Sequence, residues 1–355
     1  MKLELAAGLD DLFQALVDVE SVSGHEAGLA DAVEAALAEA PHLVVSRLGD
    51  TVMARTELGR GQRVVLAGHL DTVPVADNLP SRWTDEGGRP TLWGRGSVDM
   101  KGGLAVQLSL AASLAEPRFD LTWLFYDQEE VEASRNGLGR LARADPTALL
   151  GDMAVLLEPT AARIEAGCQG TLRVALRTAG AAAHTARSWL GHNAIHDLAR
   201  ALVILQTFQP PRISVDGLEY REGLNAVRVA GGKTNNIVPD QAELVVNYRF
   251  APDKTVAQAT DVLEALFGGY ELVVLDAAEP APPGLDQPLA AELVAASGAE
   301  PAPKLGWTDV ARFAALGLPA VNFGPGDPEL AHRPDERCPL DDLVVCRRVL
   351  ADWLA

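Results

Sequence analysis

Short apolar runs recur along the chain, and each is followed by a glycine or a charged residue. Such runs predict buried strands. The clearest of them cover residues 63–67, 121–126, 153–157 and 319–323. Other stretches have apolar residues three and four positions apart, which predicts helices at 10–19, 26–40, 104–114 and 289–297. We therefore expect an α/β fold, in which a mostly parallel sheet carries helices on both faces.

The pattern changes between residues 167 and 283. Strand-like stretches here alternate apolar and polar positions, which is typical of antiparallel strands with one exposed face. Four strands are expected at 170–176, 225–229, 243–250 and 270–275, and two helices at 194–206 and 255–267. We predict that residues 167–283 form an inserted α+β domain with a four-stranded antiparallel sheet. Residues 1–166 and 284–355 would form the catalytic domain, and the proline-rich segment 279–284 marks the boundary.

Composition narrows the class of protein. The chain has 355 residues, 48% of them hydrophobic, so it can bury a large core. A net charge of -19 argues against nucleic acid as a partner, because phosphate binding needs a cationic face. No apolar run is long enough to cross a membrane, and the N-terminus soon turns acidic, unlike a signal peptide. Three widely spaced cysteines (Cys168, Cys338, Cys346) indicate a reducing compartment. We expect a cytoplasmic protein that binds a small molecule, with no nucleic acid or membrane partner.

The first candidate for chemistry is His69, at the carboxyl end of the strand at 63–67. Asp71 follows two residues later, and on an extended backbone both side chains point the same way. Asp71 can then accept a hydrogen bond from one ring nitrogen and fix which nitrogen faces outward. Metal-binding histidines usually have such a partner. The alternative is a strand-end histidine that a nearby carboxylate merely satisfies.

A glycine-rich stretch at 94–103 supplies the second candidate, Asp99, just before the helix at 104–114. Glycines on both sides let the backbone pass close to a bound group. The alternative is a simple helix cap, the role that we also assign to Ser23 ahead of the helix at 26–40.

Further acidic residues follow the next core strands. Two adjacent glutamates, Glu129 and Glu130, follow one strand, and Glu158 follows another. Neighbouring side chains diverge, so one glutamate can bind metal while the other faces a bound water. A solvated acidic turn is the alternative. His332, in a loop after the last core strand, would by itself be a surface histidine. Sites in open α/β sheets form at the carboxyl ends of strands, so we expect these groups to meet there.

Together these positions supply two histidines and three carboxylates: His69, Asp99, Glu130, Glu158 and His332. The set suits two Zn²⁺ ions or related divalent metals, with Asp99 bridging and an open position left for water. Two such ions lower the pKa of that water and polarise a carbonyl. Glu129 is available to take the proton and pass it to a leaving amine. The residues therefore predict amide hydrolysis.

The order of these motifs resembles the two-zinc aminoacylase and carboxypeptidase family, over essentially the whole chain. The motifs are GHLDTVP at 68–74, GRGSVDMKGG at 94–103, the pair at 129–130, Glu158-Pro159 and the late His332. The resemblance implies that His69, Asp99 and Glu158 hold one zinc, and that Asp99, Glu130 and His332 hold the other. It implies that Co²⁺ or Mn²⁺ can substitute. It also implies a cis peptide bond between Asp99 and Met100.

The same resemblance implies roles for residues outside the metal set. Glu129 would be the general acid and base, and Asp71 would orient His69. The inserted domain would be a lid that also forms a homodimer. His184, in this lid, would stabilise the tetrahedral oxyanion, either after the lid closes or from a neighbouring chain. The alternative for His184 is a solvated turn histidine with no catalytic part.

Within the family, five segments look like the actinobacterial type of succinyl-diaminopimelate desuccinylases: 77–82, 165–173, 184–191, 306–310 and 323–328. This implies hydrolysis of N-succinyl-LL-2,6-diaminopimelate to succinate and LL-2,6-diaminopimelate in lysine biosynthesis. We expect substrate contacts from Arg249, Asn235, Asn236, Arg187, Gly306 and Thr308. An arginine such as Arg249 can grip a carboxylate with two hydrogen bonds, and a surface ion pair is the alternative.

Two departures from the proteobacterial branch of these enzymes leave the carboxylate contacts open. Cys168-Gln169 stand where that branch has an arginine-rich run, and Arg187 replaces a tyrosine. Another deacylase of the family, such as an acetylornithine deacetylase, or a dipeptidase is the alternative, because the same metals serve all of them. A binding protein on a degenerate scaffold is disfavoured, since every expected ligand and Glu129 are present.

Overall fold

The computed structural model describes residues 2–355 and separates them into two compact units. Unit 1 consists of the chain up to Ala166 together with Gly284–Ala302 and Arg312–Ala355. Unit 2 consists of Gly167–Pro283 and the short segment Pro303–Ala311, which the sequence had placed in the catalytic domain. The catalytic and lid roles of the two units stay predictions.

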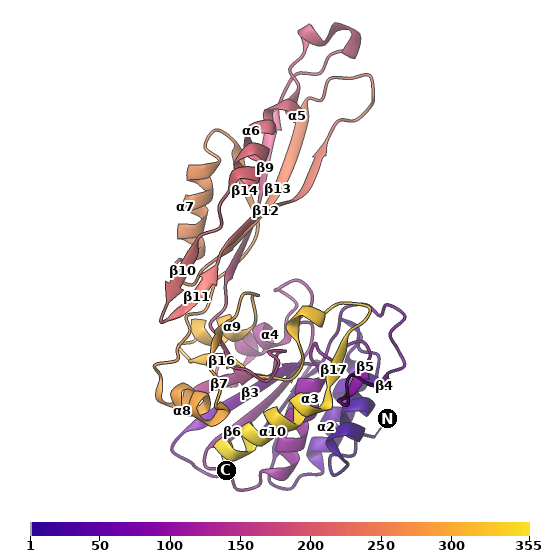
Figure 1. Cartoon of the computed structure of the whole chain (residues 1–355), viewed down its shortest axis with the longest axis vertical. Coiled ribbons are helices and arrows are strands. Elements are labelled where there is room, and N and C mark those ends of the chain that lie inside the picture. The colour runs from indigo at the N-terminus through magenta and orange to yellow at the C-terminus, as the bar shows by residue number, and fades with distance from the viewer. Residues whose placement is uncertain (1) are drawn as a thin grey trace. The chain divides into compact units, whose positions relative to one another are not determined.

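An eight-stranded sheet forms the centre of unit 1 (Figure 1). In spatial order its strands are β1 (Val44–Leu48), β2 (Thr51–Arg55), β6 (Asp120–Tyr126), β3 (Arg63–His69), β7 (Met153–Leu156), β16 (Ala320–Asn322), β8 (Glu165–Ala166) and β15 (Ala302–Pro303). The four central strands β6, β3, β7 and β16 are parallel, whereas β1, β2 and β8 pair antiparallel. The carboxyl ends of the central strands therefore lie at one edge of the sheet.

Helix α3 (Lys101–Ser113) packs closely against this sheet, and most of its residues are buried. Two glycines permit the contact. A Cβ on Gly68 of β3 would lie 2.8 Å from Met100 Cε, and one on Gly103 would lie 2.2 Å from the carbonyl oxygen of Leu157. Neither position has room for a side chain. The turn before α3, which contains Asp99, is thereby held at the carboxyl end of β3.

The remaining elements of unit 1 surround this centre. Its other helices are α1 (Leu9–Val17), α2 (Ala27–Ala38), α4 (Gly137–Ala144), α8 (Pro288–Ser297), α9 (Val310–Ala315, which begins in unit 2), α10 (Leu340–Leu354) and the 3₁₀ helix η2 (Pro328–Leu330). A small sheet that the sequence pattern did not predict has the order β17 (Arg337–Pro339), β5 (Pro90–Trp93) and β4 (Arg82–Asp85).

Unit 2 is built on a four-stranded antiparallel sheet in the order β12 (Gly223–Gly231), β13 (Gln241–Phe250), β9 (Gly170–Ala179) and β14 (Glu271–Ala278). Alternate residues of β9, namely Leu172, Val174 and Leu176, are buried in a core shared with the helices. Those helices are α5 (Ala194–Asp197), α6 (Ala199–Thr207) and α7 (Val256–Leu266), so the single helix expected at 194–206 is split in two. The hairpin β10 (Arg212–Val215) and β11 (Leu218–Arg221) and the 3₁₀ helix η1 (Thr185–Leu190) were not predicted.

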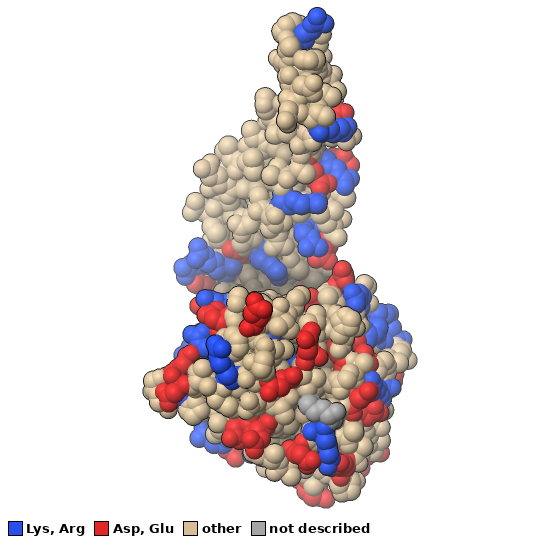
Figure 2. Space-filling view, turned by 90° about the vertical axis from the view of Figure 1, so that its right-hand side faces the viewer, with Lys and Arg blue, Asp and Glu red and all other residues tan. Residues whose placement is uncertain are grey.

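The expected fold class is confirmed: a mixed sheet with parallel central strands and packed helices, and a separate four-stranded antiparallel sheet with helices. Within residues 2–355, no helix is both long enough and apolar enough to cross a membrane. On the face that Figure 2 shows, Asp and Glu side chains are interspersed with Lys and Arg.

Candidate active site

His69 is the last residue of β3 and is 1% exposed. Its Nδ1–H donates to the backbone oxygen of Asp71 at 2.9 Å, while the nearer carboxylate oxygen of Asp71 is 3.5 Å away. The sequence predicts that the carboxylate accepts this bond, whereas in the structure the backbone oxygen is the nearer acceptor. The outcome for the ring is the same, because Nδ1 is fixed inward and Nε2 faces the carboxylate of Asp99 at 3.0 Å.

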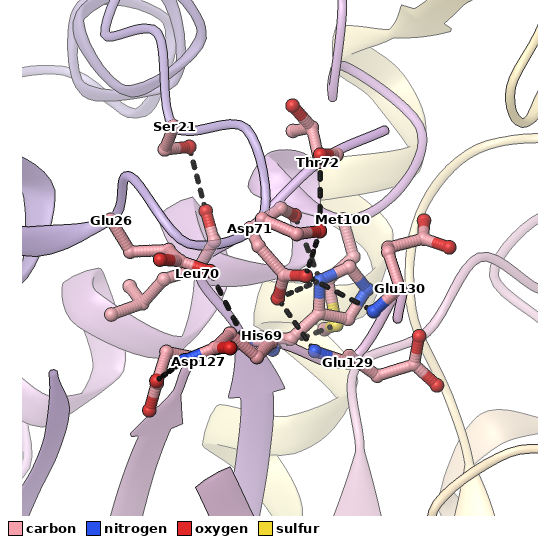
Figure 3. A network of polar contacts seen from close by, with 12 residues as sticks. Ser21, Glu26, His69, Leu70, Asp71, Thr72, Met100, Asp127, Glu129 and Glu130 are labelled. Carbon is pink, nitrogen blue, oxygen red and sulfur yellow. Dashed lines mark hydrogen bonds and ion pairs between the residues drawn. The ribbon is translucent and has the colours of Figure 1, made fainter. Parts of the chain in front are cut away.

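The carboxylate of Asp71 instead holds the turn that carries the paired glutamates (Figure 3). Oδ1 accepts the N–H of Glu129 at 2.9 Å, and Oδ2 accepts the N–H of Glu130 at 3.0 Å. Burial by itself raises the pKa of Asp71, but interactions with His69 and the hydroxyl of Ser23 outweigh it and hold the pKa below its usual value. Asp71 is therefore an ionised, fully buried anchor for two backbone groups.

A serine-containing segment supports Asp71 from the other side. The hydroxyl of Ser23 donates to Asp71 Oδ2 at 2.7 Å, and the hydroxyl of Ser21 donates to the backbone oxygen of Leu70 at 2.7 Å. The helix cap predicted for Ser23 is wrong, because α2 follows Glu26 and has no side-chain cap. The sequence offered no signal for the true role, since 48 residues separate Ser23 from Asp71.

Asp99 lies between the two histidines. Its Oδ1 is 3.0 Å from Nε2 of His69, and its Oδ2 is 3.2 Å from Nε2 of His332. The same nitrogen of His332 is 2.8 Å from Oε1 of Glu130. The peptide bond between Asp99 and Met100 is cis, so that expectation is confirmed. The structure thus brings together two histidines and two carboxylates that are far apart in the sequence.

The carboxylates of this group stabilise positive charge on the two histidines. Burial lowers the pKa of His69, but hydrogen bonds with Asp71 and Asp99 outweigh it and raise the pKa well above its usual value. Hydrogen bonds with Asp99 and Glu130 raise the pKa of His332 to about 10. Conversely, the two histidines outweigh the effect of burial and hold the pKa of Asp99 well below its usual range. The carboxylates therefore stabilise cations at the ring nitrogens.

The donor set fits divalent metal. Ligand atoms of His69, Asp99 and Glu130 all lie within 4.8 Å of one another. Imidazole nitrogens and carboxylate oxygens are the atoms that Zn²⁺ takes in catalytic sites. A carboxylate whose two oxygens face two different imidazoles has the geometry that a bridging ligand requires.

Glu158 and Glu129 lie beside this group. Glu158 comes two residues after β7, is 6% exposed, and its charge contributes to the raised pKa of His69. Glu129 is half-buried in the turn held by Asp71, and Figure 3 shows its carboxylate and that of Glu130 as two separate groups on the same side of the turn. The two adjacent glutamates can therefore serve different functions.

In a second acidic group, formed by Glu26, Asp50 and Asp127, arginine side chains contact the two aspartates. Arg140 contacts both carboxylate oxygens of Asp127 at 2.6 Å, and Arg47 contacts Asp50 at 2.8 Å. We interpret this group as a structural ion-pair network.

The residues expected to contact substrate fall into two groups within unit 2. His184 forms a β-bridge with Ile237, and its Nδ1 accepts the N–H of Ala186 at 3.0 Å. Near it, the N–H of Thr185 donates to the backbone oxygen of Asn236. Arg187, Asn235 and Asn236 thus belong with His184, close in sequence to the start of β13.

Arg249 belongs to the opposite end of the same sheet. It lies near the end of β13, where it pairs with Thr171, and burial lowers its pKa. Thr308 is 6% exposed, and its backbone oxygen accepts a bond from the thiol of Cys168, shortly before the start of β9. At about 3.4 Å per residue, the eight steps from Gln241 to Arg249 span about 27 Å. Gly306 and Thr308 therefore group with Arg249, and His184 does not.

Comparison with known proteins identifies close relatives. The family model described as "Peptidase family M20/M25/M40" matches residues 65–355. A Corynebacterium glutamicum succinyl-diaminopimelate desuccinylase is 45% identical over 100% of both chains. A Mycobacterium tuberculosis protein, provisionally named succinyl-diaminopimelate desuccinylase DapE, is 52% identical over 99% of both chains.

A solved structure shares the fold at much lower identity. The M20 family metallo-carboxypeptidase Sso-CP2 from Sulfolobus solfataricus gives a TM-score of 0.77 with 17% sequence identity, over 98% of each chain.

Proposed function

The chain belongs to peptidase family M20/M25/M40, and on that premise we propose that it removes succinate from N-succinyl-LL-2,6-diaminopimelate. The reaction adds water across one amide bond and yields succinate and LL-2,6-diaminopimelate, a step in lysine biosynthesis. The observation that carries the proposal is the 45% identity with the Corynebacterium glutamicum desuccinylase, which extends over the whole of both chains.

In this proposal two divalent ions, with Zn²⁺ as the resident metal and Co²⁺ or Mn²⁺ able to substitute, are held by His69, Asp99, Glu130, Glu158 and His332. When bound, the ions polarise the scissile carbonyl and lower the pKa of the attacking water. The support comes from Asp99, whose two oxygens face different histidines at 3.0 and 3.2 Å. Each histidine already presents Nε2 toward a carboxylate-rich space, so a cation can replace the proton there.

Glu129 would move the proton. Its carboxylate takes a proton from the attacking water and delivers it to the leaving amine nitrogen. Such transfer requires a separation of about 2.6–3.2 Å between heavy atoms, so the backbone beneath the carboxylate must be fixed. The support is the pair of bonds from Asp71 to the N–H groups of Glu129 and Glu130, which leaves the turn little freedom.

We propose that the protein forms a homodimer through unit 2. Within the described chain, β12 is an edge strand that pairs on one side only, with β13. Val227 and Val229 of this strand are 56% and 62% exposed. An unpaired edge with exposed apolar side chains favours pairing with another chain. The same β12 edge of a second copy is the partner that fits it.

The dimer would let both groups of lid residues reach substrate. About 27 Å separate Gln241, at the start of β13, from Arg249, a distance longer than a small N-acyl amino acid. One copy of unit 2 therefore cannot place both His184 and Arg249 around one substrate. We propose that Arg249, with Gly306 and Thr308, binds a substrate carboxylate. His184, with Arg187, Asn235 and Asn236, would act on a substrate held by the neighbouring chain.

A cytoplasmic location is also part of the proposal. Its support is that Cys168, Cys338 and Cys346 are all buried as free thiols, which suits a reducing compartment.

The test is steady-state kinetics on N-succinyl-LL-2,6-diaminopimelate beside N-acetylornithine, with the purified protein loaded with Zn²⁺. We expect the higher kcat/KM for the succinylated substrate, and the Glu129→Gln variant controls for contaminating hydrolases. A higher kcat/KM for N-acetylornithine would replace the desuccinylase proposal with that of an acetylornithine deacetylase.

A further inference from the structure

We infer that Glu336, paired with Arg95, is a positioning residue that fixes Asp99 between the two histidines. The inference rests on the proposed function, because it concerns how the bridging carboxylate of that site is held. Neither Glu336 nor Arg95 belongs to the set of residues expected to bind metal or substrate.

Glu336 contacts the backbone of Asp99 directly. Its side chain is 1% exposed, and Oε1 accepts the N–H of Val98 at 3.0 Å and the N–H of Asp99 at 3.1 Å. Oε2 accepts a bond from Nη1 of Arg95 at 2.7 Å. The backbone oxygen of Glu336 also accepts the N–H of Gly94 at 3.1 Å. Glu336 therefore holds both ends of the 94–99 turn.

Arg95 extends the connection to two more segments. It is 3% exposed, and its Nε donates to the backbone oxygen of Pro74 at 3.1 Å. Its Nη1 also donates to the backbone oxygen of Arg333 at 3.4 Å. Pro74 lies in the segment that follows His69, and Arg333 adjoins His332. The buried pair thus ties together the three segments that supply His69, Asp99 and His332.

The position of Asp99 is sensitive to the Glu336–Arg95 pair because its two carboxylate oxygens contact two different histidines. A displacement of its backbone changes both the 3.0 Å distance to His69 and the 3.2 Å distance to His332. Moving the carboxylate back toward one histidine lengthens its distance to the other. An anchor on the N–H of Asp99 is therefore more consequential than an anchor on a residue with one partner.

A carboxylate is required at position 336, and an amide is not equivalent. A carboxylate offers acceptors on both oxygens, to backbone N–H groups on one side and to Arg95 on the other. In Glu336→Gln, one side meets an NH₂ group, which is a donor facing donors. Either the N–H groups of Val98 and Asp99 or the guanidinium of Arg95 then loses its acceptor.

A buried carboxylate elsewhere in unit 1 provides a matched control. Asp120 is 5% exposed and accepts the N–H groups of Leu58 and Arg60 at 2.8 and 2.9 Å, with Arg63 at 3.7 Å. It has the same kinds of partner as Glu336. It lies at the amino end of β6, at the edge of the sheet opposite to the candidate site. Asp120→Asn therefore measures the stability lost when a buried carboxylate becomes an amide, at a position away from the candidate site.

The experiment compares Glu336→Gln and Asp120→Asn by Co²⁺ titration followed by absorption spectroscopy and by melting of the metal-free proteins. We expect both variants to melt at lower temperature than the unaltered protein. Only Glu336→Gln should also bind Co²⁺ about 10–100-fold more weakly, with an altered d–d spectrum, as loss of a residue supporting a metal ligand does. Its kcat should fall while KM changes less than about twofold, because substrate contacts stay in place.

Equal Co²⁺ affinity and equal spectra in the two variants would overturn the inference and leave the pair a purely structural role. If Glu336→Gln does not fold, Arg95→Lys decides the matter, because a lysine keeps the charge but not the forked contacts to Pro74 and Glu336. Arg95→Lys should then weaken Co²⁺ binding as well, and unchanged binding would again overturn the inference. Since Co²⁺ binding needs no substrate, failure of the desuccinylase proposal would appear separately, as lack of turnover by the unaltered enzyme.

Discussion

Replacing Asp71 with Asn should damage the stability and the metal site of the protein together. The Asp71 carboxylate is fully buried and accepts three bonds, from the N–H groups of Glu129 and Glu130 and from the hydroxyl of Ser23. In Asp71→Asn one oxygen becomes an NH₂ donor. The NH₂ avoids the Oδ1 position, because the N–H of Glu129 and, at 3.5 Å, Nδ1 of His69 are both donors there.

The NH₂ therefore takes the Oδ2 position, where the hydroxyl of Ser23 can rotate to accept but the N–H of Glu130 cannot. Losing one hydrogen bond to a charged acceptor costs about 1.5–3 kcal/mol. The remaining bond to the N–H of Glu129 becomes neutral and weakens by about half. The sum is about 3 kcal/mol, which corresponds to a drop in melting temperature of about 6–12 °C for a domain the size of unit 1. The end of the turn at Glu130 is displaced more than the end at Glu129.

Differential scanning calorimetry and elemental analysis of Asp71→Asn test this reasoning. We expect the drop in melting temperature, and metal loss at the position that depends on Glu130. The difference in stability from the unaltered protein should shrink in acid. The lowered pKa of Asp71 means that its contribution is present above about pH 4 and is lost as the pH falls through that pKa. A melting temperature within about 1 °C of the unaltered protein, with both ions retained, would refute the assigned role of Asp71.

Three further predictions follow from the site. Glu129→Gln should keep two ions and its melting temperature while kcat falls by about 10²–10⁴-fold, and near-normal turnover would assign the proton transfer to another group. In chelated protein, the stability lost in His332→Gln should be largest below about pH 6.5 and vanish as the pH rises toward 10, because the raised pKa of His332 makes its charge stabilising only while it is protonated. The buried Lys101, whose pKa is lowered by burial to about 7, titrates in both proteins and cancels in this difference, and a difference that does not vary with pH contradicts the assignment. Mixing Glu129→Gln chains with His184→Ala chains should restore activity if His184 acts on the neighbouring chain, whereas mixed dimers with no recovered activity exclude that arrangement.

Local patterns in the sequence determined much of this protein. Apolar runs marked β3, β6 and β7, and the residues at or just beyond the ends of these strands included His69, Glu129, Glu130 and Glu158. Burial of a strand and the position of its end are properties of a few consecutive side chains, so they can be recognised without the fold. The alternating stretches of unit 2 likewise identified its four strands.

Contacts between segments far apart in the sequence decided which partners the buried polar side chains have. Ser23, expected to cap a helix, instead donates a hydrogen bond to Asp71, 48 residues away. Glu336 accepts a hydrogen bond from the N–H of Asp99, 237 residues away. The separation of His184 from Arg249 also depended on the pairing and direction of β13. A side chain buried by tertiary packing must find a partner among whatever groups the fold brings within about 3 Å, and local sequence does not specify those groups. The sequence therefore predicted which residues bind metal, whereas the tertiary structure determined which buried residues contact them.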